Sequence, residues 1–118
     1  MLFISAAVFF LTENAFATAI TQQDDITELE KQFKECKDDK QKVEIGTTIA
    51  QYYLNQNDAK CDKYATATIK SAKKVKKENA AADMYNVIGS YYYNNKNYKK
   101  AVGAFGGYFK GSDRFFAL

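Results

Sequence analysis

Histidine, proline and tryptophan are absent from this chain of 118 residues, and only two cysteines occur. Without histidine, the chain lacks the most common general base and the most common side-chain ligand of transition metals. A cysteine nucleophile would also lack its usual partner. Gly103, Gly106 and Gly107 have neither a suitably placed lysine nor a preceding strand, so they do not form a phosphate-binding loop. We therefore expect a protein that is not an enzyme and that uses no cofactor or metal.

Positive charge is carried almost entirely by lysine. The formal net charge is +3, and Arg114 is the only arginine among 17 basic residues. Nucleic-acid sites depend on arginine for bidentate and stacking contacts. The composition therefore does not favour a nucleic-acid partner.

Long apolar runs are also scarce, and the one that exists lies at the start of the chain. Residues 2–11 form an apolar run of ten, whereas a membrane-spanning helix needs about 20 residues. Ala15-Phe16-Ala17 follows as a small-residue cleavage pattern. We predict a signal peptide over residues 1–17 and a periplasmic or secreted protein with no stable membrane span after cleavage. The run has no Lys or Arg before it, so an uncleaved anchor and a start upstream of Met1 remain open.

Because proline is absent and no segment alternates between apolar and polar residues, the remaining chain of about 100 residues is predicted to be one all-α domain. Residues 18–24 are expected to be a flexible leader. Helical repeats are expected over residues 25–110, and an irregular tail over residues 111–118.

The most regular pattern lies at residues 85–105. Apolar and small residues recur at helical spacing on two segments, separated by an asparagine-rich turn at 94–97. The positions that define it are Tyr85, Ile88, Gly89, Tyr92, Tyr98, Ala101 and Phe105. A small residue on each segment lets the two helices approach closely. The pattern predicts a helical hairpin.

This hairpin resembles one tetratricopeptide repeat, whose pattern is aromatic-x2-Leu-Gly-x2-Tyr followed by Ala-x3-Phe. A less regular second repeat begins about 39 residues earlier, whereas the family's period is 34. Its defining positions are Ile49, Ala50, Tyr53, Ala65, Ile69 and Ala72. We assign three extra residues to the turn at 55–61 and two to 76–79. Gly46 stands where the pattern expects an aromatic residue.

A leading helix with an apolar stripe at Ile26, Leu29 and Phe33 resembles the second half of a further repeat. The polar run 37–42 is expected to be the turn after it. The resemblance thus implies a solenoid of about two and a half repeats. Phe105, Tyr108, Phe109, Phe115 and Phe116 would lie on or beyond its uncapped end, where they would favour self-association.

The resemblance also implies a function, because the first helices of such repeats line a groove that binds a peptide or a partner's helix. By family position, that groove would be lined by Glu44, Thr47, Gln51, Leu54, Asn55, Asp83, Asn86, Ser90, Tyr93 and Asn94. We therefore predict an exported, non-catalytic protein-protein interaction module. The alternative is the N-terminal sensor or ligand-binding part of a larger bacterial membrane signalling protein, such as a histidine kinase.

The two cysteines, Cys36 and Cys61, would be offset by roughly 15 Å along parallel helices, which is too far for a disulfide. Export to an oxidising compartment would favour one, so the bridge remains open. We expect Cys36 to be a buried, small apolar residue.

Overall fold

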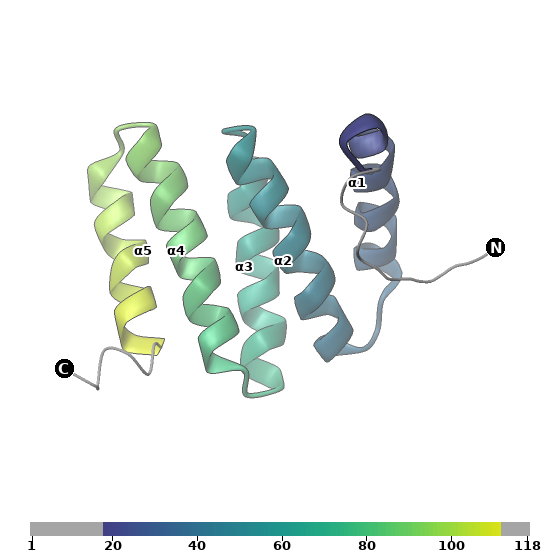
Figure 1. Cartoon of the computed structure of the whole chain (residues 1–118). Coiled ribbons are helices and arrows are strands. Elements are labelled where there is room, and N and C mark those ends of the chain that lie inside the picture. The colour runs from purple at the N-terminus through teal and green to yellow at the C-terminus, as the bar shows by residue number, and fades with distance from the viewer. Residues whose placement is uncertain (1–17, 112–118) are drawn as a thin grey trace.

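Five α-helices make up most of the part of the chain that the computed structural model describes, residues 18–111. They are α1 (Thr18–Glu35), α2 (Asp39–Asn55), α3 (Lys60–Lys74), α4 (Glu78–Asn94) and α5 (Tyr98–Gly111). No strand occurs among these residues, so the predicted all-α class is confirmed. Figure 1 shows the helices in a row with α1 at one end and α5 at the other.

The α2 and α4 helices are built alike. Each has 17 residues, and they begin 39 residues apart at Asp39 and Glu78. Each is followed, two residues after its last residue, by a residue with positive φ, Asn57 at 53° and Lys96 at 61°, which turns the chain sharply. The next amide then bonds back into the helix in both cases, to the Tyr53 carbonyl at 2.9 Å and the Tyr92 carbonyl at 2.8 Å. These matched ends satisfy carbonyls that a helix terminus leaves without partners.

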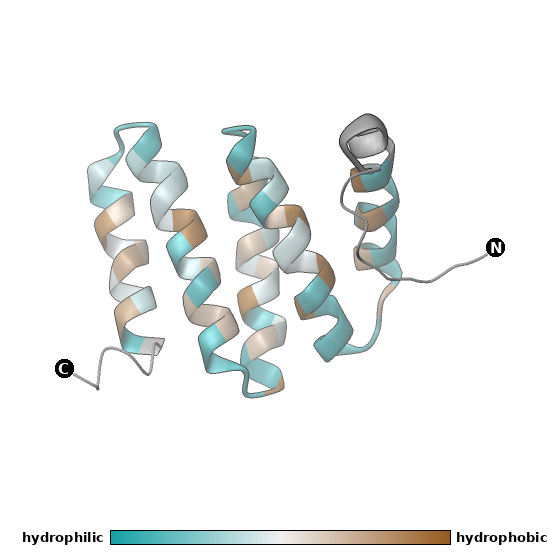
Figure 2. Cartoon of the chain, in the orientation of Figure 1, coloured by the Kyte–Doolittle hydropathy of each residue, from teal (hydrophilic) through white to brown (hydrophobic). Residues whose placement is uncertain are grey.

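Neighbouring helices pack in sequence, and one further contact crosses the row. α2 packs on α3, α3 on α4 and α4 on α5, while α2 also contacts α4. α1 packs against α2. The core runs between these helices, and its largest fully buried side chains are Ile49, Cys61, Thr68 and Met84. Figure 2 shows the corresponding hydrophobic stripes along the helices, with hydrophilic turns between them.

Gly46 and Gly89 are among the glycines that allow this close packing. A Cβ at Gly89 would lie 2.5 Å from the Phe105 ring, as expected for the small position of the predicted hairpin. A Cβ at Gly46 would lie 1.9 Å from Thr68 Oγ1 and 2.8 Å from the Phe33 ring. The sequence pattern expects an aromatic residue at Gly46. The structure shows instead that Gly46 makes room for side chains from both α1 and α3.

The predicted helix boundaries are wrong at two starts. α1 begins at Thr18, within the predicted flexible leader, because no glycine or proline separates residues 18–24 from the stripe that follows. α2 begins at Asp39, within the predicted turn 37–42. There the Asp38 side chain accepts a hydrogen bond from the Lys40 amide at 3.1 Å, and the good helix formers Lys40, Gln41 and Lys42 continue the helix.

The prediction of three extra residues in the turn at 55–61 is also wrong. The turn after α2 consists of residues 56–59 and the turn after α4 of residues 95–97, so they differ by one residue and not by three. The first three residues of both turns make the same hydrogen bonds at an offset of 39 residues. The predicted signal peptide 1–17 and residues 112–118 of the predicted tail lie outside the described residues.

Gly46→Ala tests the close approach of α1, α2 and α3. Thr68 is buried and its hydroxyl donates to the Tyr64 carbonyl at 2.7 Å, so it cannot easily make room for the new methyl group. We expect overpacking to lower the free energy of unfolding by about 1–3 kcal/mol. Urea denaturation measures this change.

Gly103→Ala is the matched control, since a Cβ there meets nothing within 4 Å. Replacing this exposed helical glycine should stabilise the protein by up to about 1 kcal/mol. If Gly46→Ala and Gly103→Ala changed the free energy of unfolding equally, the close packing of α1 and α3 on Gly46 would be contradicted.

Candidate functional site

The ten residues predicted to line a groove lie on two adjacent helices, five on α2 and five on α4. Each residue on α2 has its counterpart 39 residues later on α4, at the same distance from the helix start. Three of them are half-buried, namely Thr47, Leu54 and Ser90, and the other seven are exposed. We call these ten positions the α2–α4 face.

The chemistry of the α2–α4 face is that of amides, hydroxyls and two carboxylates. Gln51, Asn86 and Asn94 can hydrogen-bond to a peptide backbone. Tyr93 is 58% exposed, and its ring packs edge-on against Tyr98 at a centroid distance of 5.4 Å. Glu44 and Asp83 make the face weakly acidic, since no lysine or arginine belongs to it.

Two asparagines that the sequence analysis missed hold one end of this face together. Asn95 Nδ2 donates to Asn57 Oδ1 at 2.8 Å, and Asn57 Nδ2 donates back to Asn95 Oδ1 at 3.3 Å. Asn95 Nδ2 also donates to the Tyr91 carbonyl at 2.8 Å. These bonds join the turn after α2 to the turn after α4. The asparagine-rich turns signalled helix ends, but nothing local signalled the pairing.

Tyrosine hydroxyls join each of these helices to the helix before it. Tyr53 of α2 donates to Glu30 Oε2 of α1 at 2.5 Å, and Tyr92 of α4 donates to Asp62 of α3. Burial, followed by the bond to Glu30, raises the pKa of Tyr53 well above its usual range. The bond to Asp62, followed by burial, raises the pKa of Tyr92 to about 12. Two equivalent tyrosines therefore make equivalent bonds to acidic residues.

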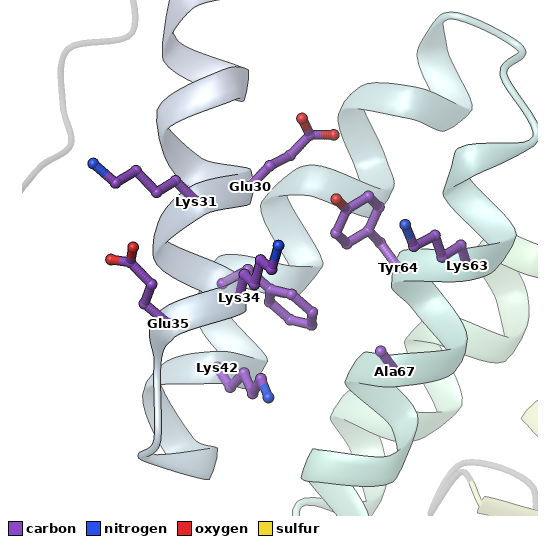
Figure 3. A pocket seen from close by; sticks show the side chains of 9 residues that line it. Glu30, Lys31, Lys34, Glu35, Lys42, Lys63, Tyr64 and Ala67 are labelled. Atoms are coloured by element: carbon purple, nitrogen blue, oxygen red, sulfur yellow. The ribbon is translucent and has the colours of Figure 1, made fainter.

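An open groove of about 970 Å³ lies elsewhere, between α1, α2 and α3. It is lined by Glu30, Lys31, Phe33, Lys34, Glu35, Lys42, Lys63, Tyr64 and Ala67. Figure 3 shows Tyr64 and Glu30 facing each other across it, while Lys31 and Glu35 project from α1 away from α3. We call it the α1–α3 groove. Sequence reasoning missed it, because it depends on how α1 leans against its neighbours.

The cysteines differ from the prediction in one respect. Both are free in the structure. Cys36 is half-buried rather than buried, because it follows the last residue of α1 and its thiol donates to the Asp38 carbonyl at 3.3 Å. Cys61 is the fully buried one, and burial, together with the nearby charge of Asp62, raises the pKa of its thiol to about 11.

Comparison with protein-family models, curated proteins and solved structures finds no match to the chain. Across residues 18–111, no group of three or more metal-ligating side chains is present. No helix in this described part has both the length and the apolar character required to cross a membrane.

Tyr92→Phe tests the bond between α4 and α3. A hydrogen bond to a charged group contributes about 1.5–3 kcal/mol, so we expect a loss of this order at neutral pH. In the unmodified protein, the stabilisation from the protonated hydroxyl is complete below the unfolded pKa of about 10. As pH rises towards 12, the unfolded chain loses this proton while the folded protein keeps it, so stability falls.

Removing the hydroxyl should therefore flatten the decline in stability between pH 10 and pH 12. Chemical denaturation at a series of pH values measures it. Tyr98→Phe, at an exposed ring of α5, is the control and should leave the profile unchanged. Parallel declines in Tyr92→Phe and the unmodified protein would show that this hydroxyl does not cause the pH dependence.

Proposed function

We propose that the chain is a non-catalytic protein-interaction module, built as a tetratricopeptide-like stack of helical hairpins. A peptide or a partner's helix binds along the α2–α4 face. The observation that carries this proposal is the register of that face: ten positions chosen from the repeat pattern lie in matched pairs on two helices in contact. Seven of the ten are exposed.

The architecture behind the face supports this role. Ile49, Ala50 and Tyr53 of α2 are buried beneath it, as are Ala81, Met84 and Ile88 of α4. The Asn57–Asn95 pair fixes the two turns at one end. A face whose helices are held in place from behind loses little freedom on binding, and this preorganisation favours affinity.

Export through the signal peptide 1–17 belongs to this proposal and is supported by the apolar run and the Ala-x-Ala pattern alone. A role as the N-terminal sensor part of a larger signalling protein would use the same α2–α4 face for a ligand. The amide-rich composition of the face suits a peptide backbone better than a small apolar ligand.

Selection of peptides from a displayed random library tests the α2–α4 face. Peptides that bind the protein should lose at least about tenfold in affinity, or 1.4 kcal/mol, on Asn86→Ala combined with Tyr93→Ala. Fluorescence anisotropy of the labelled peptides measures it. Lys70→Ala, an exposed change on α3, is the control. If the selected peptides bind the unmodified protein, the double variant and Lys70→Ala with equal affinity, the binding surface lies outside the α2–α4 face.

A second partner surface is favoured by the exposed apolar residues of α5. Val102 is 70% exposed and Phe109 is 50% exposed. Of the other aromatic residues predicted at the uncapped end, Phe105 and Tyr108 are half-buried, and Phe105 covers Gly89. Phe115 and Phe116 lie outside the described residues. We propose that α5 supports weak self-association through Val102 and Phe109.

Sedimentation velocity tests the self-association. The average sedimentation coefficient should rise with concentration, and Val102→Glu with Phe109→Glu should abolish the rise, because a buried contact cannot hold unpaired carboxylates. Lys99→Gln, an exposed change on the same helix, should leave it intact. A monomer at every concentration would contradict the proposal.

A further inference from the structure

We propose that the α1–α3 groove is a second binding site, which takes a short acidic segment of a partner protein. The segment's carboxylates would contact lysines from three helices, and one apolar side chain would rest on the aromatic floor between them. This site is separate from the α2–α4 face and does not depend on the function proposed for that face.

The floor of the groove is apolar and fixed in place. Phe33 is only 8% exposed, and its ring meets Tyr64 edge-on at a centroid distance of 5.4 Å. Tyr64 in turn stacks on Tyr53 at 6.0 Å. Ala67, one turn further along α3, is too small to fill the space beside them. An apolar side chain from outside could therefore be buried here without displacing the core.

The rim of the groove carries lysines from α1, α2 and α3, namely Lys34, Lys42 and Lys63. The Lys42 ammonium lies 5.3 Å from the centre of the Phe33 ring, and the Lys63 ammonium lies 5.3 Å from the centre of the Tyr64 ring. Cation–π contacts hold these two charges beside the apolar floor.

The Glu30 carboxylate faces the same space, and it already accepts the Tyr53 hydroxyl at 2.5 Å. Glu35 and Lys31 also line the groove, and both project from α1 away from α3 (Figure 3). Four lining lysines against two lining glutamates leave the groove positive. A ligand that brings several negative charges is therefore complementary to it.

The spread of the charges indicates the class of ligand. Three lysines on three helices, around a groove of about 970 Å³, suit several separated carboxylates better than one compact anion. Lysine also binds as a point charge and lacks the planar fork that favours phosphate and nucleic-acid recognition. The aromatic floor adds a place for an apolar side chain. A peptide of mixed acidic and apolar sequence has both features.

A fluorescein-labelled peptide with the sequence Glu-Asp-Glu-Phe-Asp-Glu is the probe, and fluorescence anisotropy with the whole protein is the measurement. We expect saturable binding that weakens as salt rises, because part of the attraction is between partly exposed charges. Lys34→Gln combined with Lys63→Gln should weaken binding about tenfold. Both lysines are exposed, so these changes should leave the fold intact, and the thermal transition checks this.

Three controls make the result specific. Lys70→Gln with Lys74→Gln removes two exposed lysines of α3 that lie outside the groove, and it should leave the affinity nearly unchanged. Replacing the phenylalanine of the probe by serine should weaken binding at least threefold if the aromatic floor takes part. Asn86→Ala with Tyr93→Ala should have no effect, which separates this site from the α2–α4 face.

Several outcomes would overturn the proposal. The first is an absence of saturable binding below roughly 1 mM peptide, which corresponds to about 4 kcal/mol. The second is an equal loss in the groove variant and in the Lys70 and Lys74 variant, which would indicate attraction to lysine in general. The third is groove-dependent binding of phosphatidylserine vesicles without binding of the peptide, which would assign the groove to a lipid surface.

Discussion

The close approach of helices at Gly46 and Gly89 is the constraint on which the rest of the structure depends. Each glycine faces a side chain of the helix that follows, Thr68 in one case and Phe105 in the other. A methyl group at either position would push α2 or α4 outward. Because the α2–α4 face is defined by the spacing of these two helices, its register depends on residues that lie beneath it.

Much of this arrangement could be predicted from local pattern. The spacing of Tyr85, Gly89 and Tyr92 fixed one face of α4, because helical periodicity is carried by neighbouring residues alone. The starts of α1 and α2 could not be predicted, since polar residues such as Asp38 and Lys40 occur in turns and in first helical turns alike. Their conformation is decided by hydrogen bonds that a pattern does not show.

Long-range contacts explain the other misses. Gly46 departs from the repeat pattern, and the sequence around it does not explain why a glycine is needed there. The glycine makes room for the Phe33 ring and the Thr68 hydroxyl, which come from two other helices. The α1–α3 groove was missed for the same reason, since Phe33, Lys42 and Lys63 meet only after three helices have packed. Asn57 and Asn95 likewise pair across 38 residues of sequence. Each of these features is a property of the packing, whereas the residues of the α2–α4 face were accessible from periodicity.

The α5 end of the helical row differs from the interior of the row in the kind of contact it can make with another helix. Within the row, a tyrosine hydroxyl joins a helix to a carboxylate of the preceding helix, at Glu30 of α1 and at Asp62 of α3. α5 has no acidic residue anywhere between Tyr98 and Gly111, so it cannot provide the same bond to a helix packed on its outer side. It presents Val102 and Phe109 instead. A helix that covers α5 would therefore meet exposed apolar side chains and would lack the tyrosine–carboxylate bond that joins helices inside the row.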